Sequence, residues 1–250
     1  MKRIFASRRT RWAAIVILIV LPAMLAAYSV FEFRRPNSFG EDHGFLNFFA
    51  NNSDWILGLL FLAISAVPFL LVFERRRPQA RELVPIAVMS ALAVVGRTVF
   101  SIVPLPNFKP VTAIVMITGI AFGPEAGYLT GALAALLSNF LFGQGPWTPW
   151  QMVSWGIVGF LTGTLYRTGI FGTVGQAATD EEGKRKKPIL LCVAGFLFSV
   201  LYGWIMNLQY ILGYVRPFSL QAVAAAYLSS AWFDISHGIC TALVLWVAAE

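Results

Sequence analysis

Residues 139–151 read N-F-L-F-G-Q-G-P-W-T-P-W-Q and interrupt two apolar runs that are each long enough to cross a bilayer. Two glycines and two prolines in this stretch (Gly143, Gly145, Pro146 and Pro149) exclude a helix that runs through it. The pattern therefore predicts two membrane helices joined by a rigid loop. Its two tryptophans and its amides suit a plain anchor at the membrane surface or the rim of a binding site, and we favour the rim.

Composition indicates a membrane protein. Of the 250 residues, 58% are hydrophobic and 12% are charged, against a usual charged share of about 25%. Helices and closed barrels are the structures that span a bilayer, and continuous apolar runs favour helices over alternating strands. We therefore predict an all-α, polytopic membrane helical bundle. Cys192 and Cys240 lie inside apolar runs, so we expect buried thiols and neither a disulfide nor a metal site.

The apolar runs predict eight spans in two parts. The first part is a two-helix N-terminal extension (residues 1–81) that ends in a cytoplasmic linker at 74–81. The second part is a six-helix transmembrane core (residues 82–250). A cleaved signal peptide is the alternative for the first span, but its length and an internal proline favour an uncleaved helix. A kink is expected at Pro68 of the second span. The spans are 12–31, 54–73, 82–103, 108–123, 124–142, 151–168, 188–213 and 221–248.

Basic residues orient the spans. They concentrate in segments 2–11, 74–81 and 184–187, whereas the loops on the other side hold few. Because cytoplasmic loops carry the excess of lysine and arginine, both termini are expected in the cytoplasm of a cell-membrane protein. The same orientation puts the 139–151 stretch outside. The net charge of +7 is explained in this way, so nucleic acid is not an expected partner.

Polar and aromatic side chains at the predicted outer helix ends suggest a pocket that opens outward. A buried ionisable group is costly unless it is paired or hydrated, although Arg97 near the end of its span has snorkelling as an alternative. The candidate substrate-binding residues are Arg97, Asn107, Lys109, Asn139, Gln144, Trp147, Trp150, Gln151, Asn207, Tyr210 and Asp234, and Tyr214 and Arg216 fall at the same end.

Asp234 and His237 lie three positions apart on one helix face. The pair could act as a proton relay, and we favour a structural hydrogen bond between core helices. No nucleophile–base pattern or ATP-binding signature is visible, and no cofactor or metal is expected.

Small residues recur at the cytoplasmic start of the first core helix, where Ala87 and Ala91 are four positions apart. This spacing lets two helices approach closely in lipid. It suits docking on another subunit, and packing within the same chain is the alternative.

The core resembles the substrate-binding membrane subunits (S components) of energy-coupling factor (ECF) vitamin transporters, and within them a subgroup near proposed cobalamin transporters. The motifs that carry this resemblance are Ala87-x-x-x-Ala91, G-R-T-V-F at 96–100, N-F-K-P-V at 107–111, the segment 138–152 and F-D-I-S-H at 233–237. The resemblance implies a six-helix fold with an outward pocket for a vitamin, a corrinoid being the first candidate. It also implies docking through Ala87 and Ala91 on a transmembrane coupling subunit that two cytosolic ATPases drive.

Two other classes of protein compete with a transport subunit. One is a membrane sensor or scaffold that recruits partners through its N-terminus and residues 169–187. The other is an intramembrane enzyme that uses Asp234 and His237, although few titratable groups lie together.

Overall fold

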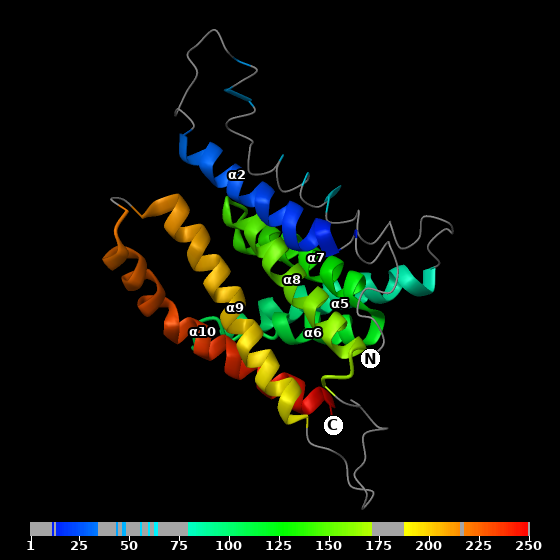
Figure 1. The fold of residues 1–250 in the computed structure, drawn as a ribbon. Helices are drawn as coiled ribbons and strands as arrows, with labels where there is room; N and C mark the ends of the chain where they lie inside the picture. The colour runs from blue at the N-terminus through cyan, green and yellow to red at the C-terminus, as the bar shows by residue number, and fades with distance from the viewer. Residues whose placement is uncertain are drawn as a thin grey trace, which may run out of the picture.

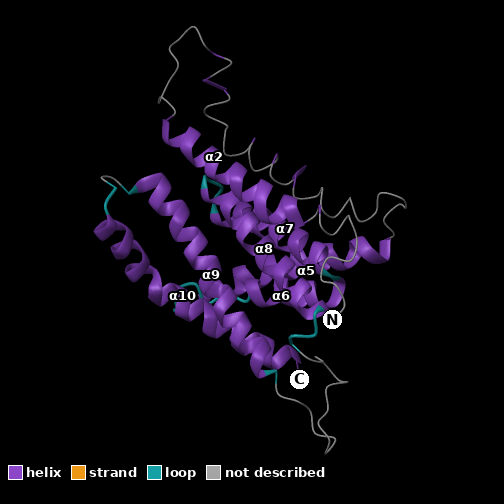
Figure 2. Ribbon diagram, viewed as in Figure 1, coloured by secondary structure: helices purple, strands orange, loops and turns teal. Residues whose placement is uncertain are grey.

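The structure is a computed structural model that describes residues 14–34, 80–171, 188–215 and 218–249, with isolated positions at 12, 44, 47, 48, 56, 60, 63 and 64. Within these residues the fold is entirely helical (Figure 2). The elements are η1 (Val16–Val20), α2 (Leu21–Arg34), α5 (Ala80–Val99), η2 (Phe100–Ile102), α6 (Val111–Phe122), α7 (Pro124–Phe142), α8 (Trp147–Arg167), α9 (Ile189–Tyr214) and α10 (Leu220–Ala249).

The all-α prediction is confirmed, and each of the six predicted core spans corresponds to one of the helices α5 to α10. Consecutive helices pack as neighbours: α7 lies against α8, α9 against α10, and α6 against both α7 and α8. Figure 1 shows α2 on one side of the bundle and α10 on the other. The predicted span 54–73, with Pro68, lies almost wholly outside the described residues, and the division at residue 81 stays a prediction.

The predicted break between α7 and α8 is present but shorter than expected. Helix α7 ends at Phe142, and Gly143 has a φ of 95°, a conformation that favours glycine. Helix α8 begins at Trp147, so residues 147–151 are helical rather than part of a loop. The sequence predicts that Pro149 breaks the helix, but proline is tolerated in the first turn because the backbone N–H groups there have no intrahelical partner.

Glycines let α6, α7 and α8 approach closely. A Cβ atom added to Gly159 would lie 2.4 Å from the backbone carbon of Gly127, and one added to Gly119 would lie 2.4 Å from the Gly159 oxygen. Helices in lipid associate largely through such close packing, because lipid chains are as apolar as the side chains. These three glycines therefore form the centre of the bundle that positions the polar groups described below.

The N-terminal helix packs on the core through one face. Its buried residues recur every three or four positions, as expected for a helix with one buried stripe; they are Ala14, Ile17, Leu21, Leu25 and Tyr28. Pro22 has no N–H to donate, which accounts for the π-helical turn η1 just before it. Contacts with α8 and α9 join this helix to the main hydrophobic cluster.

In the part of the chain that the structure describes, three helices are long and apolar enough to cross a membrane, within Leu83–Ile102, Ile189–Tyr214 and Leu220–Ala248. Shorter apolar helices occur at Val16–Ser29 and Val111–Phe122. Large apolar side chains are widely exposed on α5, α9 and α10, as a lipid-facing surface requires.

Candidate functional site

The C-terminal turn of α5 carries a buried arginine. The side chain of Arg97 is 8% exposed, so it does not snorkel to the surface as the alternative expectation had it. Its Nη1 atom donates hydrogen bonds to Oγ of Ser138 at 2.5 Å and to Oδ1 of Asn139 at 2.8 Å, both on α7. The guanidinium carbon lies 4.7 Å from the centre of the Phe142 ring and 5.3 Å from that of Trp155. Arg97 thus joins three core helices at one point.

Asn139 connects this arginine to the start of α8. Its Nδ2 atom donates to Oγ1 of Thr148 at 2.8 Å and to Oε1 of Gln151 at 2.9 Å. Thr148 in turn donates to Oε1 of Gln144 at 2.8 Å. One hydrogen-bonded group therefore contains four of the predicted residues, which are Arg97, Asn139, Gln144 and Gln151. We call this group, together with Ser138 and Thr148, the outer polar network.

Lys109 brings a second cation to the same place. Its Nζ atom lies 5.0 Å from the centre of the Phe142 ring, which also contacts Arg97. Burial lowers the pKa of Lys109, and the positive charge of Arg97 lowers it further. Within the described residues, neither cation forms a salt bridge; the ion pair between Arg167 and Glu125 lies at the opposite end of α8. The two positive charges consequently favour an anionic or acceptor-rich group beside Phe142.

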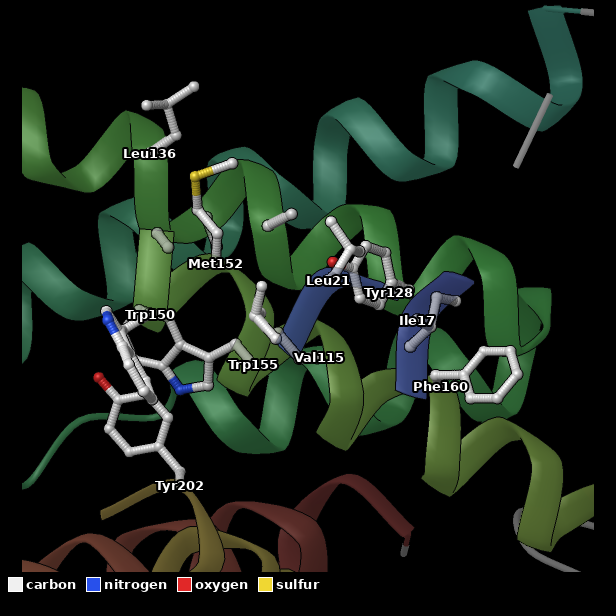
Figure 3. Close-up of a cluster of buried hydrophobic side chains, with 14 of the residues drawn as sticks. Ile17, Leu21, Val115, Tyr128, Leu136, Trp150, Met152, Trp155, Phe160 and Tyr202 are labelled. Carbon is white, nitrogen blue, oxygen red and sulfur yellow. The ribbon is translucent and has the colours of Figure 1, made fainter. Parts of the chain in front are cut away.

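An aromatic group borders the outer polar network. The rings of Trp155 and Tyr202 stack with centres 4.6 Å apart, and Tyr202 meets the edge of His237 at 5.3 Å. Figure 3 shows the Trp155 and Tyr202 rings beside Trp150 in the buried cluster. These side chains come from α8, α9 and α10, so the three helices share one aromatic junction.

His237 has hydrogen-bond partners outside its own helix. Nδ1 lies 3.3 Å from Nδ2 of Asn107, and Nε2 lies 3.0 Å from Oγ1 of Thr112, which also accepts a hydrogen bond from Nε1 of Trp155 at 3.1 Å. This geometry fits the tautomer with the proton on Nε2. Structural hydrogen bonding between helices, the favoured expectation for His237, is what the contacts show.

Asp234 belongs to a different group. Its Oδ2 atom accepts a 3.4 Å hydrogen bond from Ser230, which also accepts one from Asn207 at 2.5 Å. In the described part of the chain, Asp234 and His237 therefore have separate partners, which gives no support to a proton relay. No group of three potential metal ligands occurs among the described residues.

Among the described residues, the remaining candidates share no side-chain hydrogen bond with the outer polar network. Tyr210 is 51% exposed and stacks on Tyr214 with ring centres 5.8 Å apart. Trp147 donates to the Gly143 carbonyl oxygen at 3.4 Å, within its own turn. Trp150 is 5% exposed and packs in the hydrophobic cluster, so it is a core residue rather than part of an exposed rim. Arg216 lies outside the described residues.

Sequence reasoning did not select several residues that hold the site together. Ser138 precedes Asn139, and Thr112 follows the loop that carries Lys109; both are hydroxyls in apolar helices, a signal that could have marked them. Trp155, Tyr202 and Phe142 carried no such signal, because an aromatic residue in an apolar run is ordinary.

The two alanines expected to dock another subunit are exposed. Ala87 and Ala91 lie on the open face of α5, between Val84, Val88 and Leu92, which are 55%, 57% and 49% exposed. In contrast, Ser90 and Ala93 face the core, at 1% and 0% exposed. Among the described residues, packing within the same chain therefore uses the neighbouring small residues rather than this pair.

One family model matches the core of the chain. The model of the family described as "ECF-type riboflavin transporter, S component" matches residues 78–249. UPF0397 proteins from Streptococcus agalactiae serotypes Ia and V are each 27% identical over 161 residues, which cover 63% of this chain and 83% of theirs. No solved structure was found to match the chain.

Proposed function

Because the chain belongs to the family of ECF-type riboflavin transporter S components, we propose that it binds a vitamin or related micronutrient at the outer polar network. Membership makes the chain a substrate-binding transporter subunit and a multi-pass membrane protein, not an enzyme. The identity of the ligand, the residues that bind it and the orientation in the membrane are parts of the proposal.

The buried cation Arg97 is the observation that supports this site most directly. A charged group removed from water is costly unless an opposite charge or several hydrogen bonds compensate it. Arg97 has two hydrogen bonds, both from Nη1, and no carboxylate partner among the described residues. With Lys109 beside it, the guanidinium is suited to an anionic or carbonyl-rich edge of a ligand.

Flat walls around this cation limit the class of ligand. Phe142 lies within contact distance of both positive groups, and Trp155 forms a stacked pair with Tyr202. Aromatic walls with a few placed polar groups are usual in small-molecule pockets. We propose a ligand with a flat conjugated ring and an acceptor-rich edge. Riboflavin, which gives the family its description, is the first candidate, and cobalamin, indicated by the sequence resemblance, is the second.

Titration tests the site and separates the candidates. The purified chain in lipid nanodiscs is titrated with riboflavin and with cobalamin, and binding is followed by tryptophan fluorescence. Arg97→Gln should weaken binding of the true ligand at least tenfold, equivalent to about 1.4 kcal/mol. Arg167→Gln, which removes an exposed cation at the other end of α8, is the control and should leave affinity unchanged. Equal affinity in the wild type and in Arg97→Gln would place the ligand elsewhere.

Coupling completes the proposed function. The exposed Ala87 and Ala91 would dock on a transmembrane coupling subunit, and two cytosolic ATPases would supply the energy. With the outer polar network facing outward, both termini would lie in the cytoplasm, in line with the distribution of basic residues.

A further inference from the structure

A separate cavity of about 230 Å³ lies where the N-terminal helix meets the core. Its walls come from three elements: Tyr28 and Ser29 of α2, Trp150 at the start of α8, and Gln209, Gly213 and Tyr214 of α9. None of these residues belongs to the outer polar network. Because α2 lies outside residues 78–249, the part of the chain that the family model matches supplies only some of the walls.

Two polar side chains of this cavity have no hydrogen-bond partner within the described part of the chain. Gln209 is 8% exposed, and its amide has one donor group and one acceptor group to satisfy. Trp150 is 5% exposed, and its indole N–H is a donor. Neither belongs to the fully enclosed polar atoms without a partner, which are the hydroxyls of Ser90, Thr130 and Ser236, so both groups remain open to the space of the cavity. Both line the same space, where one occupant can hydrogen-bond to the two of them.

The chemistry of the walls defines that occupant. Three aromatic side chains, Tyr28, Trp150 and Tyr214, surround it, and none of its described lining residues is charged. A charged ligand would have no charged partner among these residues, and an acyl chain would not use the hydrogen-bonding groups of Gln209 and Trp150. The cavity is smaller than the 300–1,000 Å³ or so of pockets for drug-sized ligands, so the occupant is small.

We propose that this cavity is a second binding site, for a small, neutral, planar molecule with a hydrogen-bond donor and acceptor on one edge. The carbonyl of such an amide-like edge accepts from Trp150, and the edge exchanges hydrogen bonds with Gln209, while the ring lies among the aromatic side chains. Ser29 and Tyr28 make the N-terminal helix part of this site, which gives the extension a role beyond membrane anchoring. The proposal does not depend on the ligand of the outer polar network.

Benzamide and benzoate are matched probes for this site, because they share a ring and differ in charge. Each is titrated by ligand-observed NMR against the full chain in nanodiscs. We expect saturable binding of benzamide and at least tenfold weaker binding of benzoate. Non-saturable binding of benzamide, or equal binding of both probes, would overturn the proposal.

Substitutions then locate the bound probe. Gly213→Leu should abolish benzamide binding by filling the cavity, because a Cβ atom at this exposed position meets nothing closer than Gln209 at 3.7 Å. Ser29→Leu fills the cavity from the α2 wall. Among the described residues, the Ser29 hydroxyl donates to the backbone oxygen of Leu25 in its own helix, so little else is lost. Gln209→Leu keeps the bulk but removes the amide and should weaken binding at least fivefold.

Two controls keep the outcome specific. Leu208→Ala alters an exposed neighbour on α9, and Arg97→Gln alters the outer polar network; both should bind benzamide as the wild type does. Thermal unfolding verifies that each variant is folded. If a folded Gly213→Leu or Ser29→Leu variant binds benzamide as tightly as the wild type, the probe is bound elsewhere and the proposal fails. Loss in Arg97→Gln alone would assign the probe to the first site.

Discussion

The Nη1 atom of Arg97 donates a 2.8 Å hydrogen bond to Oδ1 of Asn139, and this contact joins the end of α5 to the end of α7. The same Asn139 side chain donates through Nδ2 to Thr148 and Gln151 of α8. One amide thus satisfies a buried cation on one side and two polar side chains on the other. Few other residue types supply both an acceptor and two donors at one position.

Asn139→Ala should lower the free energy of unfolding by about 1–3 kcal/mol, because it leaves buried polar groups without partners. The measurement is thermal or denaturant unfolding in detergent, compared with Ser229→Ala. That control removes an exposed hydroxyl whose bond is local to α10, so a change within about 0.5 kcal/mol is expected. Similar stability of the two variants would mean that Asn139 is not the centre of the network.

Trp150 and Trp147 are expected to respond differently to truncation. Trp150 is 5% exposed in the main hydrophobic cluster, so Trp150→Ala should cost about 3–5 kcal/mol of unfolding free energy. Trp147 is half-buried and contacts its own turn, so Trp147→Ala should cost much less. Expression and melting temperature of the two variants decide the question. Equally small losses would instead support the interpretation of both tryptophans as one exposed rim.

The difference between these tryptophans shows where sequence reasoning reaches its limit. Apolar runs and glycine–proline clusters place the helices, because lipid allows few other structures. The face that each side chain takes within a helix depends on its neighbours in three dimensions. Pro149 marks a boundary in the sequence but does not tell whether the helix starts before or after it. The pattern therefore predicts a loop at residues 147–151, where the structure has the first turn of α8.

Sequence pattern predicts some members of the outer polar network but not the bonds between them. A polar side chain in an apolar span is conspicuous, and this signal selects Arg97 and Asn139. These two residues bond to each other although they are 42 positions apart along the chain, so no local pattern predicts the pairing. The same limit applies to Asn207 and Asp234. The sequence groups them with the other candidates, whereas in the structure both bond to Ser230.

Gly159→Val should loosen the α6–α7–α8 contact. The added Cβ atom would lie 2.4 Å from the backbone of Gly127, so the helices must separate, at a cost of about 1–3 kcal/mol or more. Gly213→Ala is a matched control, because its Cβ atom would meet nothing closer than 3.7 Å. The melting temperatures of the two variants are compared in one detergent. If Gly159→Val melts at the wild-type temperature, the packing argument is wrong.

Membrane orientation can be measured with single cysteines. Thr148 is 1% exposed, so a reporter there would be shielded. Leu105, 44% exposed after α5, and Ile170, 52% exposed after α8, lie at opposite ends of the core. In a chain with Cys192 and Cys240 replaced by serine and alanine, Leu105→Cys should react with an impermeant thiol reagent added outside intact cells, and Ile170→Cys should not. The reverse labelling pattern would contradict cytoplasmic termini.

The exposed face of α5 gives the last prediction. Ala87→Trp or Ala91→Trp should prevent close approach of a partner helix and so abolish co-purification with the coupling subunit and its ATPases. Ligand affinity of the isolated chain should persist, because both alanines lie on the open face of α5, away from the buried Arg97. Leu243→Trp, at a 55% exposed position on α10, is the control for a bulky residue facing lipid. If the α5 variants assemble as well as Leu243→Trp does, docking uses another face; if they also lose ligand affinity, the substitutions disturb the fold rather than the interface.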